Sequence, residues 1–184
     1  MGIVSGDLER AVQRAFTRPI PKSAGAQMRY LVRQLKGTRA VADLLGVSQR
    51  TVERYVKDQI RRPRADLAAR LADAVRARWQ PRIREQARHQ AATATGLVID
   101  TRARFGFTAA PGTTDDARVR HLTLALPPAH AARLFDAQQA GATDDQLRDI
   151  TAEALGEVYF RDGGRRAAGL LVKFTNVEQL DFEL

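Results

Sequence analysis

The sequence predicts an α+β protein, with an all-helical domain over residues 1–92 followed by a small α+β domain with antiparallel strands over residues 93–184. The first observation is charge. Residues 1–92 carry 20 basic and 8 acidic side chains, a net charge of +12, whereas residues 93–184 carry 10 basic and 13 acidic side chains, a net charge of −3. The second is periodicity, which changes near AATATG, residues 91–96. There, helical spacing of apolar residues gives way to the alternating polarity of strands.

The first domain is expected to be helical throughout. Ser23 is a suitable N-cap for a helix over residues 24–36, and Gly37 should end it. The apolar residues of this helix recur at helical spacing: Met28, Leu31, Val32 and Leu35. Further helices are expected over 38–45, 48–57 and 65–91. Pro81 should bend or break the last one, because proline lacks the amide proton that a helix interior needs.

The second domain is expected to mix strands and helices. Residues 99–107 and 121–126 alternate between apolar or small residues and polar ones, as a strand with one buried face does. Pro127 and Pro128 should start a helix that ends near Gly141. Thr143 and Gln146 have the spacing of a capping box and should open a helix to about residue 160. Segments 170–174 and 177–184 are predicted as two closing strands.

Composition excludes several classes of function. The chain has 184 residues and no cysteine, so it forms no disulfide and has no thiol nucleophile or cysteine-bound zinc. Three scattered histidines make a metal site unexpected, and we predict no metal or cofactor of its own. The net charge of +9 favours a polyanionic partner. No long apolar run and no apolar leader pattern is present, so we expect a cytoplasmic protein that does not bind membranes.

The segment TRAVADLLGVSQRTVERYVKDQ, residues 38–59, has the spacing of a helix-turn-helix. Ala42, four residues before Gly46, allows two helices to approach, and Gly46 can take the positive φ of the turn. Ser48 should cap the second helix. The residues predicted to bury the seam between the two helices are Val41, Leu45, Val47, Val52 and Val56.

This arrangement leaves a polar face for DNA. The side chains expected to face the major groove are Gln49, Arg50, Thr51, Arg54 and Lys57. Arg61, Arg62 and Arg64, beside Pro63, are predicted to clamp the phosphate backbone. The alternative is an ordinary helical hairpin whose charged face is only solvated, and the basic surplus of the domain favours the DNA-binding interpretation over it.

Over essentially its whole length the chain resembles the telomere terminal proteins of the Tpg type, which cap linear chromosomes and plasmids of Streptomyces and related actinobacteria. The resemblance is carried by AVADLLGVSQRTVERYVKDQIRRP, residues 40–63, and by TRARFGFTAAPGTTDDARVRHLTLALPP, residues 101–128. It implies protein-primed end replication, in which a threonine hydroxyl receives dCMP and stays linked to the DNA 5′ end. The chain would then be a substrate of the polymerase and not an enzyme.

The priming threonine of the family corresponds to Thr114 here, with the adjacent Thr113 as the second candidate. Both lie in AAPGTTDDA between two predicted strands, where Pro111 and Gly112 favour a turn. Without the resemblance, a plain hairpin turn is the simpler interpretation. The nucleotide substrate dCTP and the divalent metal would both come with the polymerase.

The resemblance also implies partners: telomeric DNA, a DNA polymerase and a telomere-associated protein, at the ends of chromosomes or plasmids in the nucleoid. A homodimer is left open. Acidic residues between 144 and 157 form either a contact for a basic protein or a solvated helix face. Two rival functions are a transcriptional repressor with a dimerising or ligand-sensing C-terminal domain and a recombination or partition accessory protein. Neither rival would become covalently modified.

Overall fold

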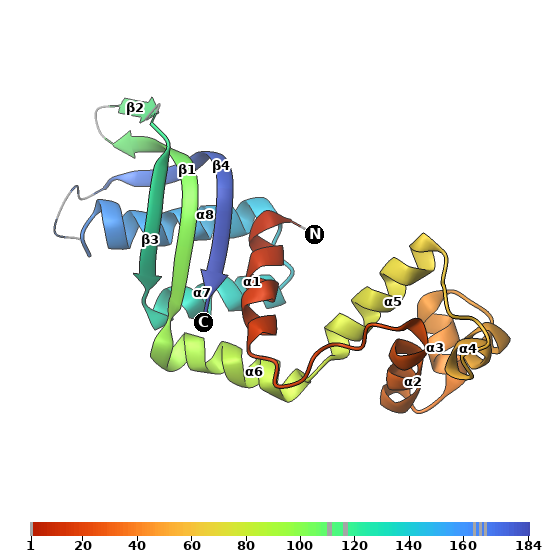
Figure 1. Ribbon diagram of the computed structural model, residues 1–184. Coiled ribbons are helices and arrows are strands. Elements are labelled where there is room, and N and C mark those ends of the chain that lie inside the picture. The colour runs from red at the N-terminus through yellow and green to blue at the C-terminus, as the bar shows by residue number, and fades with distance from the viewer. Residues whose placement is uncertain (1, 110–111, 116–117, 164, 166, 168) are drawn as a thin grey trace. The chain divides into compact units, whose positions relative to one another are not determined.

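The computed structural model describes residues 2–109, 112–115, 118–163, 165, 167 and 169–184, without the side chains of 109 and 112–115. Helices and an antiparallel sheet are both present (Figure 1), so the α+β expectation is confirmed. The chain divides into two compact units. Thr17–Pro81 forms one, here called the helical unit, and Met1–Phe16 with Arg82–Leu184 forms the other, here called the sheet unit.

The helical unit consists of α2 (Ala24–Leu35), α3 (Thr38–Leu45), α4 (Gln49–Val56) and α5 (Ala65–Arg78). Ser23 caps α2 as predicted, since its hydroxyl accepts a hydrogen bond from the amide of Ala26. Gly37 was expected to end this helix, but Lys36 makes the left-handed turn with a φ of 57°, and Gly37 is extended. All four helices contribute buried side chains to one core, among them Met28, Leu45, Val52 and Leu71.

The turn between α3 and α4 has the predicted geometry. Gly46 has a φ of 61°, a conformation that glycine adopts without a steric penalty. Val41, Leu45 and Val52 are buried in the seam, and Val47 and Val56 pack against them half-buried. The hydroxyl of Ser48 accepts from the amide of Thr51 at 3.2 Å, which caps α4. These local predictions are confirmed.

Pro81 breaks the predicted helix over residues 65–91. α5 ends at Arg78, Trp79 is extended, Gln80 has a φ of 45°, and Pro81 is the first residue of α6 (Pro81–Gln90). Proline is tolerated there because the first residue of a helix needs no intrahelical amide hydrogen bond. The π-helical turn η1 (Ala91–Thr95) follows α6 directly.

The sheet has four antiparallel strands: β1 (Leu97–Ala109), β2 (Gly112–Asp115), β3 (Arg120–Leu126) and β4 (Leu171–Glu183). β1 is central and pairs with each of the other three. The two closing strands expected over 170–174 and 177–184 are a single strand. Extra residues of β4 at Thr175 and Glu178 shift its register against β1, and such bulges bend a strand without ending it.

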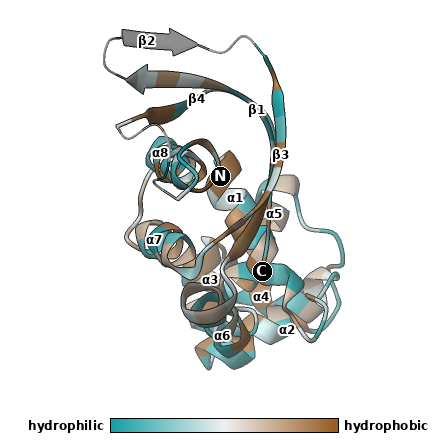
Figure 2. Cartoon of the chain, turned by 90° about the vertical axis from the view of Figure 1, so that its left-hand side faces the viewer, coloured by the Kyte–Doolittle hydropathy of each residue, from teal (hydrophilic) through white to brown (hydrophobic). Residues whose placement is uncertain are grey.

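Helices cover one face of this sheet (Figure 2). They are α7 (Pro128–Gln139) and α8 (Asp144–Leu155), which continues as the π-helical turn η2 (Gly156–Phe160). The capping box of Thr143 and Gln146 is present as predicted. The core beneath the sheet contains Ile99, Phe105, Leu134 and Phe182, each fully buried.

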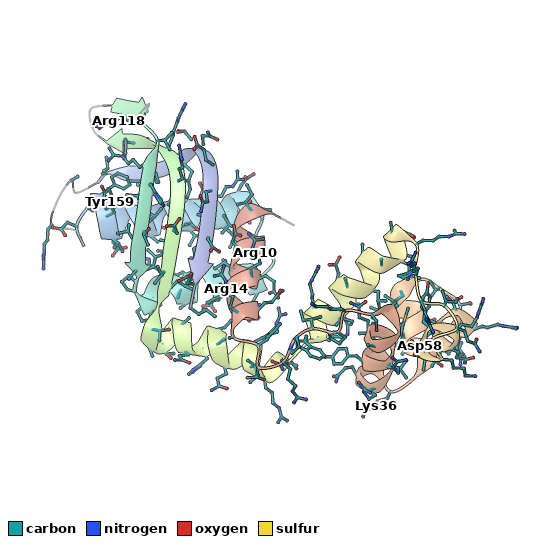
Figure 3. All side chains as sticks on the ribbon, viewed as in Figure 1. Arg10, Arg14, Lys36, Asp58, Arg118 and Tyr159 are labelled. Carbon is teal, nitrogen blue, oxygen red and sulfur yellow. The ribbon has the colours of Figure 1, made fainter. Side chains whose placement is uncertain are left out.

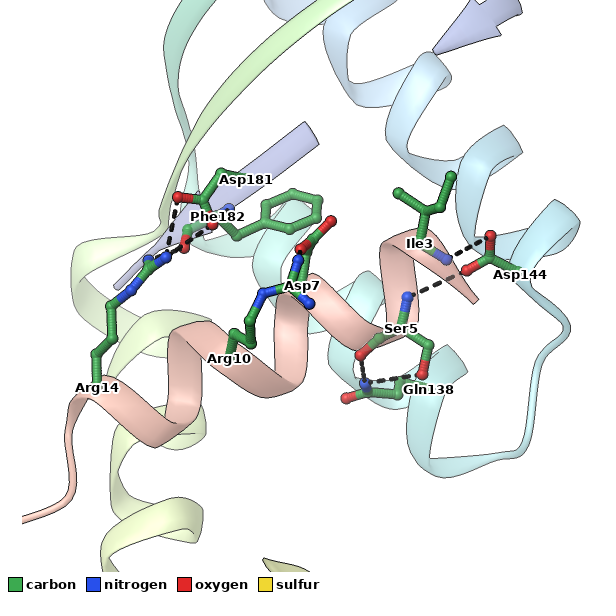
Figure 4. A network of polar contacts seen from close by, with 9 residues as sticks. All are labelled: Ile3, Ser5, Asp7, Arg10, Arg14, Gln138, Asp144, Asp181 and Phe182. Atoms are coloured by element: carbon green, nitrogen blue, oxygen red, sulfur yellow. Dashed lines mark hydrogen bonds and ion pairs between the residues drawn. The ribbon is translucent and has the colours of Figure 1, made fainter. Parts of the chain in front are cut away.

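The first helix, α1 (Ile3–Arg14), belongs to the sheet unit (Figure 4). Asp144 of α8 caps it, since its carboxylate accepts from the amides of Ile3 at 3.1 Å and Ser5 at 3.2 Å. At the other end, Arg14 donates to the carbonyl of Phe182 at 2.5 Å and to the carboxylate of Asp181 at 2.8 and 2.9 Å.

A buried ion pair fixes α1 to α6 as well. Glu9 contacts Arg84 at 2.6 Å, and both side chains are nearly buried. The division into units therefore differs from the boundary expected between residues 92 and 93. The segments 1–16 and 82–92 pack with the sheet because their apolar and charged partners, such as Val4, Leu8 and Glu9, find their contacts there.

Candidate functional site

The start of α4 is held by hydrogen bonds between its own polar side chains. The hydroxyls of Ser48 and Thr51 lie 2.8 Å apart. Gln49 donates to the hydroxyl of Thr38 on α3 at 3.1 Å and to Glu53 at 3.0 Å. Of the side chains expected to face DNA, Gln49 and Thr51 thus form hydrogen bonds with other residues of the helical unit. Their hydrogen bonds hold them in fixed orientations at the outer end of α4.

The cations that follow are different. They are exposed, and within residues 17–81, which are all described, none of them forms a hydrogen bond or an ion pair through its side chain: Arg50, Arg54, Lys57, Arg61, Arg62 and Arg64. We call these six residues the cationic surface. Arg50, Arg54 and Lys57 follow at helical spacing and share one side of α4. Arg61, Arg62 and Arg64 lie in the segment without regular secondary structure that leads to α5. Asp58, labelled in Figure 3, lies just after α4 and before this segment.

Three other arginines of the helical unit are paired. Arg29 of α2 contacts Asp58 at 2.8 Å and donates to the carbonyl of Val56 at 2.8 Å, which satisfies the end of α4. Arg70 contacts Asp66, and Arg76 contacts Asp73, within α5. The unit has 15 basic and 5 acidic residues, a net charge of +10. Three of the five acids of this fully described unit pair with these arginines and Glu53 accepts from Gln49, and none of the five forms an ion pair with the cationic surface.

Three further cations were missed by reasoning from the helix-turn-helix segment alone. Arg33 and Lys36 at the end of α2 and Arg39 in the first turn of α3 are exposed and have no ion-pair partner in the helical unit. Arg39 is next to Thr38, to which Gln49 donates. The sequence shows that these three residues are charged and stand at polar positions of two helices. Only the packing of α2 and α3 beside α4 shows that they belong to the same unit as the cationic surface.

The threonine segment forms a hairpin with the end of β1. Thr114 pairs with Phe107 and Thr113 with Thr108, so both threonines lie in strand β2 rather than in the turn that the sequence predicted. Residues 110 and 111 stand between the two strands in the sequence. These two residues, and the side chains of Thr113 and Thr114, lie outside the part that the structure describes. Gly112 favours a turn, but the segment pairs as a strand because pairing with β1 gives its backbone N–H and C=O groups hydrogen-bond partners.

Aromatic side chains support the base of this hairpin. Phe107 contacts Phe160 of η2 with ring centroids 5.0 Å apart, and Phe105 contacts both Phe160 and Phe174. Thr108, the register partner of Thr113, is exposed, whereas Phe107, the partner of Thr114, is half-buried. The hairpin is therefore anchored at β1 by packing.

A second polar cluster lies near the other end of β1. The hydroxyl of Thr123 donates to the carboxylate of Asp100 at 2.6 Å, and His121 lies 3.1 Å from it. The hydrogen bond from Thr123 and the presence of His121 lower the pKa of Asp100. Asp100 is then a carboxylate at neutral pH. It accepts from the hydroxyl of Thr123 and holds the imidazole of His121 beside it on the surface of the sheet.

The acidic residues between 144 and 157 are largely used inside the sheet unit. Asp144 caps α1, and Glu153 pairs with Arg133 at 2.5 Å. Within the described ranges no three His, Asp or Glu side chains gather as a metal site would require. No helix in those ranges is both long and apolar enough to span a bilayer.

Comparison with known proteins gives no relative. No protein-family model, no curated protein and no solved structure matches the chain significantly.

Proposed function

We propose that this protein is a telomere terminal protein that binds telomeric DNA through its helical unit and serves as the protein primer of end replication. The observation that carries the proposal is the cationic surface: six exposed cations on α4 and the following segment, without an acidic partner in a unit of net charge +10. Unpaired guanidinium groups on a protein surface suit phosphate groups, whose binding releases counterions from DNA.

The helix-turn-helix assignment of α3 and α4 belongs to this proposal. The left-handed Gly46, the buried seam and the capped start of α4 support it. In this arrangement Arg50 and Arg54 reach base edges or phosphates, and Arg61, Arg62 and Arg64 hold the backbone.

The priming step rests on the resemblance and on the hairpin. The hydroxyl of Thr114, or of Thr113 as the second candidate, attacks the α-phosphorus of dCTP in line. The bond between threonine Oγ and phosphorus forms, the bond to pyrophosphate breaks, and the hydroxyl proton passes to a base of the polymerase or to water. The polymerase brings the divalent metals that neutralise the phosphate charge. The chain itself remains a substrate, and a telomere-associated protein would recruit it to the DNA end in the nucleoid.

Labelling with radioactive dCTP tests the priming step. The purified protein is incubated with a DNA polymerase, a telomeric single strand as template and a divalent metal, and then separated by denaturing electrophoresis. We expect a label that persists after denaturation and disappears in Thr114→Val, or in Thr113→Val if the second candidate is used. Thr175→Val, an exposed threonine of β4, is the matched control and should keep its label. Label retained in both Thr113→Val and Thr114→Val would place the linkage elsewhere.

DNA binding by the helical unit is tested separately. Arg54→Ala should weaken binding to telomeric DNA by about 1 to 3 kcal/mol if Arg54 contacts a base. Arg70→Ala is the control, because Arg70 already pairs with Asp66. Unchanged affinity and specificity of Arg54→Ala would contradict the orientation of α4. The repressor alternative predicts binding to a palindromic duplex and no covalent label at all.

A further inference from the structure

The sheet unit leaves one face of its sheet uncovered. Along β1 the buried residues alternate with accessible ones, and α7 and α8 lie on the side of the buried set (Figure 2). The residues of β1 that point to the other side are Val98, Asp100, Arg102, Arg104, Gly106 and Thr108. All of them are accessible except Gly106, which is buried. We call this side the open face. It carries charged side chains from β1 and its neighbours rather than a second layer of helices.

Charge is sorted along the open face. Near the end of β1 that pairs with β4 at Phe182, the face carries Asp100 and Asp181, which are register partners. Near the hairpin it carries Arg102, Arg104 and Lys173. Arg102 pairs with Glu178 at 2.9 Å, whereas Arg104 and Lys173 are exposed and form no ion pair with any side chain that the structure describes. Asp115 of β2 is the other register partner of Gly106. Among the described side chains, the hairpin half therefore carries two cations without an acidic partner in a unit that is close to neutral.

The spacing of these two cations suits one nucleic-acid strand. Lys173 is the register partner of Gly106, which lies two residues beyond Arg104 on the same face. Because two residues of a strand advance by about 7 Å, Arg104 of β1 and Lys173 of β4 are diagonal neighbours on two paired strands. Two cations at such a separation can contact adjacent phosphates of one strand. The preference for a single strand comes from the single-stranded template of the proposed function.

Among the side chains that the structure describes, the aromatic rings at this end of the sheet lie on the covered side. Phe105 and Phe107 pack against Phe160, and Phe174 packs against Phe105. Base stacking on aromatic rings is what gives many single-strand binders contact with bases. A surface that offers cations without such rings binds phosphates and reads no sequence.

We propose that the hairpin half of the open face, through Arg104 and Lys173, binds the phosphodiester backbone of a DNA single strand, as a second DNA contact in addition to the cationic surface. The inference rests on the proposed function, in which a single-stranded template must pass close to the hairpin that carries the threonines. It adds a role for the sheet unit: holding that strand near the hairpin independently of its sequence.

The test is the salt dependence of binding to a labelled oligothymidylate of about 20 nucleotides, longer than the usual site of a single-strand binding module. We expect the double variant Arg104→Gln/Lys173→Gln of the full chain to lower the slope of log affinity against log salt by about 1.4, since each phosphate contact on a single strand contributes about 0.7. At about 0.1 M salt this amounts to an affinity about 25-fold weaker. Circular dichroism verifies that the variant is folded.

The control variant Arg82→Gln/Arg133→Gln removes the same charge from α6 and α7 of the same unit. A slope and affinity equal to those of this control would overturn the proposal. An equal loss for a duplex of the same length would overturn the assignment to a single strand. The variant Arg50→Gln/Arg54→Gln measures DNA binding by the cationic surface, and covalent labelling with dCTP measures priming. The experiments therefore distinguish a protein that lacks the proposed function from one whose open face does not bind DNA.

Discussion

The buried ion pair between α1 and α6 gives the sharpest test of how the sheet unit is assembled. Glu9 contacts Arg84 at 2.6 Å and Arg88 at 3.5 Å, and its side chain is 11 % exposed. Burial and the charge of Arg84 lower the pKa of Arg88, and Glu9 opposes that shift. Glu9→Gln keeps the shape of the side chain but removes the negative charge that faces the guanidinium groups of Arg84 and Arg88.

Removing one partner of a buried ion pair costs about 3 to 5 kcal/mol, because the remaining charge stays desolvated. Since the arginine side chains here are 12 and 21 % exposed, we expect the lower end, about 3 kcal/mol. For a unit of this size that corresponds to a fall in Tm of about 10 °C. Urea unfolding followed by circular dichroism measures the loss, and hydrogen exchange of the α1 amides locates it.

Glu85→Gln is the matched control, because Glu85 is an exposed acid on the same helix α6. It should change the free energy of unfolding by less than about 0.5 kcal/mol. The double variant Glu9→Gln/Arg84→Gln should recover part of the loss, since it removes one of the stranded charges. If Glu9→Gln destabilises the protein no more than Glu85→Gln does, the pair is not buried in solution. The packing of α1 on α6 would then be wrong.

Three further predictions concern single residues. Gly46→Ala should destabilise the helical unit by about 1 kcal/mol because its φ is 61°, and Leu71→Ala, at a fully buried site, by about 3 to 5 kcal/mol. Trp79 fluorescence in urea measures both, and a smaller loss for Leu71→Ala would contradict the core. Because Thr123 and His121 lower the pKa of Asp100, its carboxylate stabilises the fold above about pH 4, and this contribution disappears as the pH falls through the lowered pKa. Asp100→Asn should therefore lower the free energy of unfolding at pH 7 and have little effect on it near pH 2, as urea unfolding measures. An equal loss of stability at the two pH values would refute the role of the charge of Asp100.

Local signals predicted the helical unit well. A hydroxyl before an apolar helix, as at Ser23 and Ser48, caps it through contacts within three residues, and a glycine such as Gly46 turns the chain through its own φ. The exception is Lys36, which takes the left-handed position in place of Gly37. Which of two neighbouring residues turns the chain depends on how the next helix packs, and no local pattern records that.

The candidate site was predicted unevenly. The polar face of α4 followed from helical period once its apolar face was assigned to the core. The pairing of Arg70 with Asp66, four residues earlier on the same helix, could be read from the chain. The pairing of Arg29 could not, because Asp58 and Arg29 meet only through the packing of α2 on α4. The open face was missed for a similar reason, since Arg104 and Lys173 are far apart in sequence and become neighbours only through β1 and β4 pairing.

The sequence by itself determined where most helices and strands begin and end and which half of the chain carries the positive charge, because caps, turns and periodicity act over a few residues. Only the tertiary structure decided that α1 joins the sheet rather than the neighbouring helices, and that one bulged strand replaces two. The apolar face of α1 would bury equally well against any core. Its place is fixed by Asp144, Asp181 and Arg84, partners that lie many residues away and that only the folded chain brings to it.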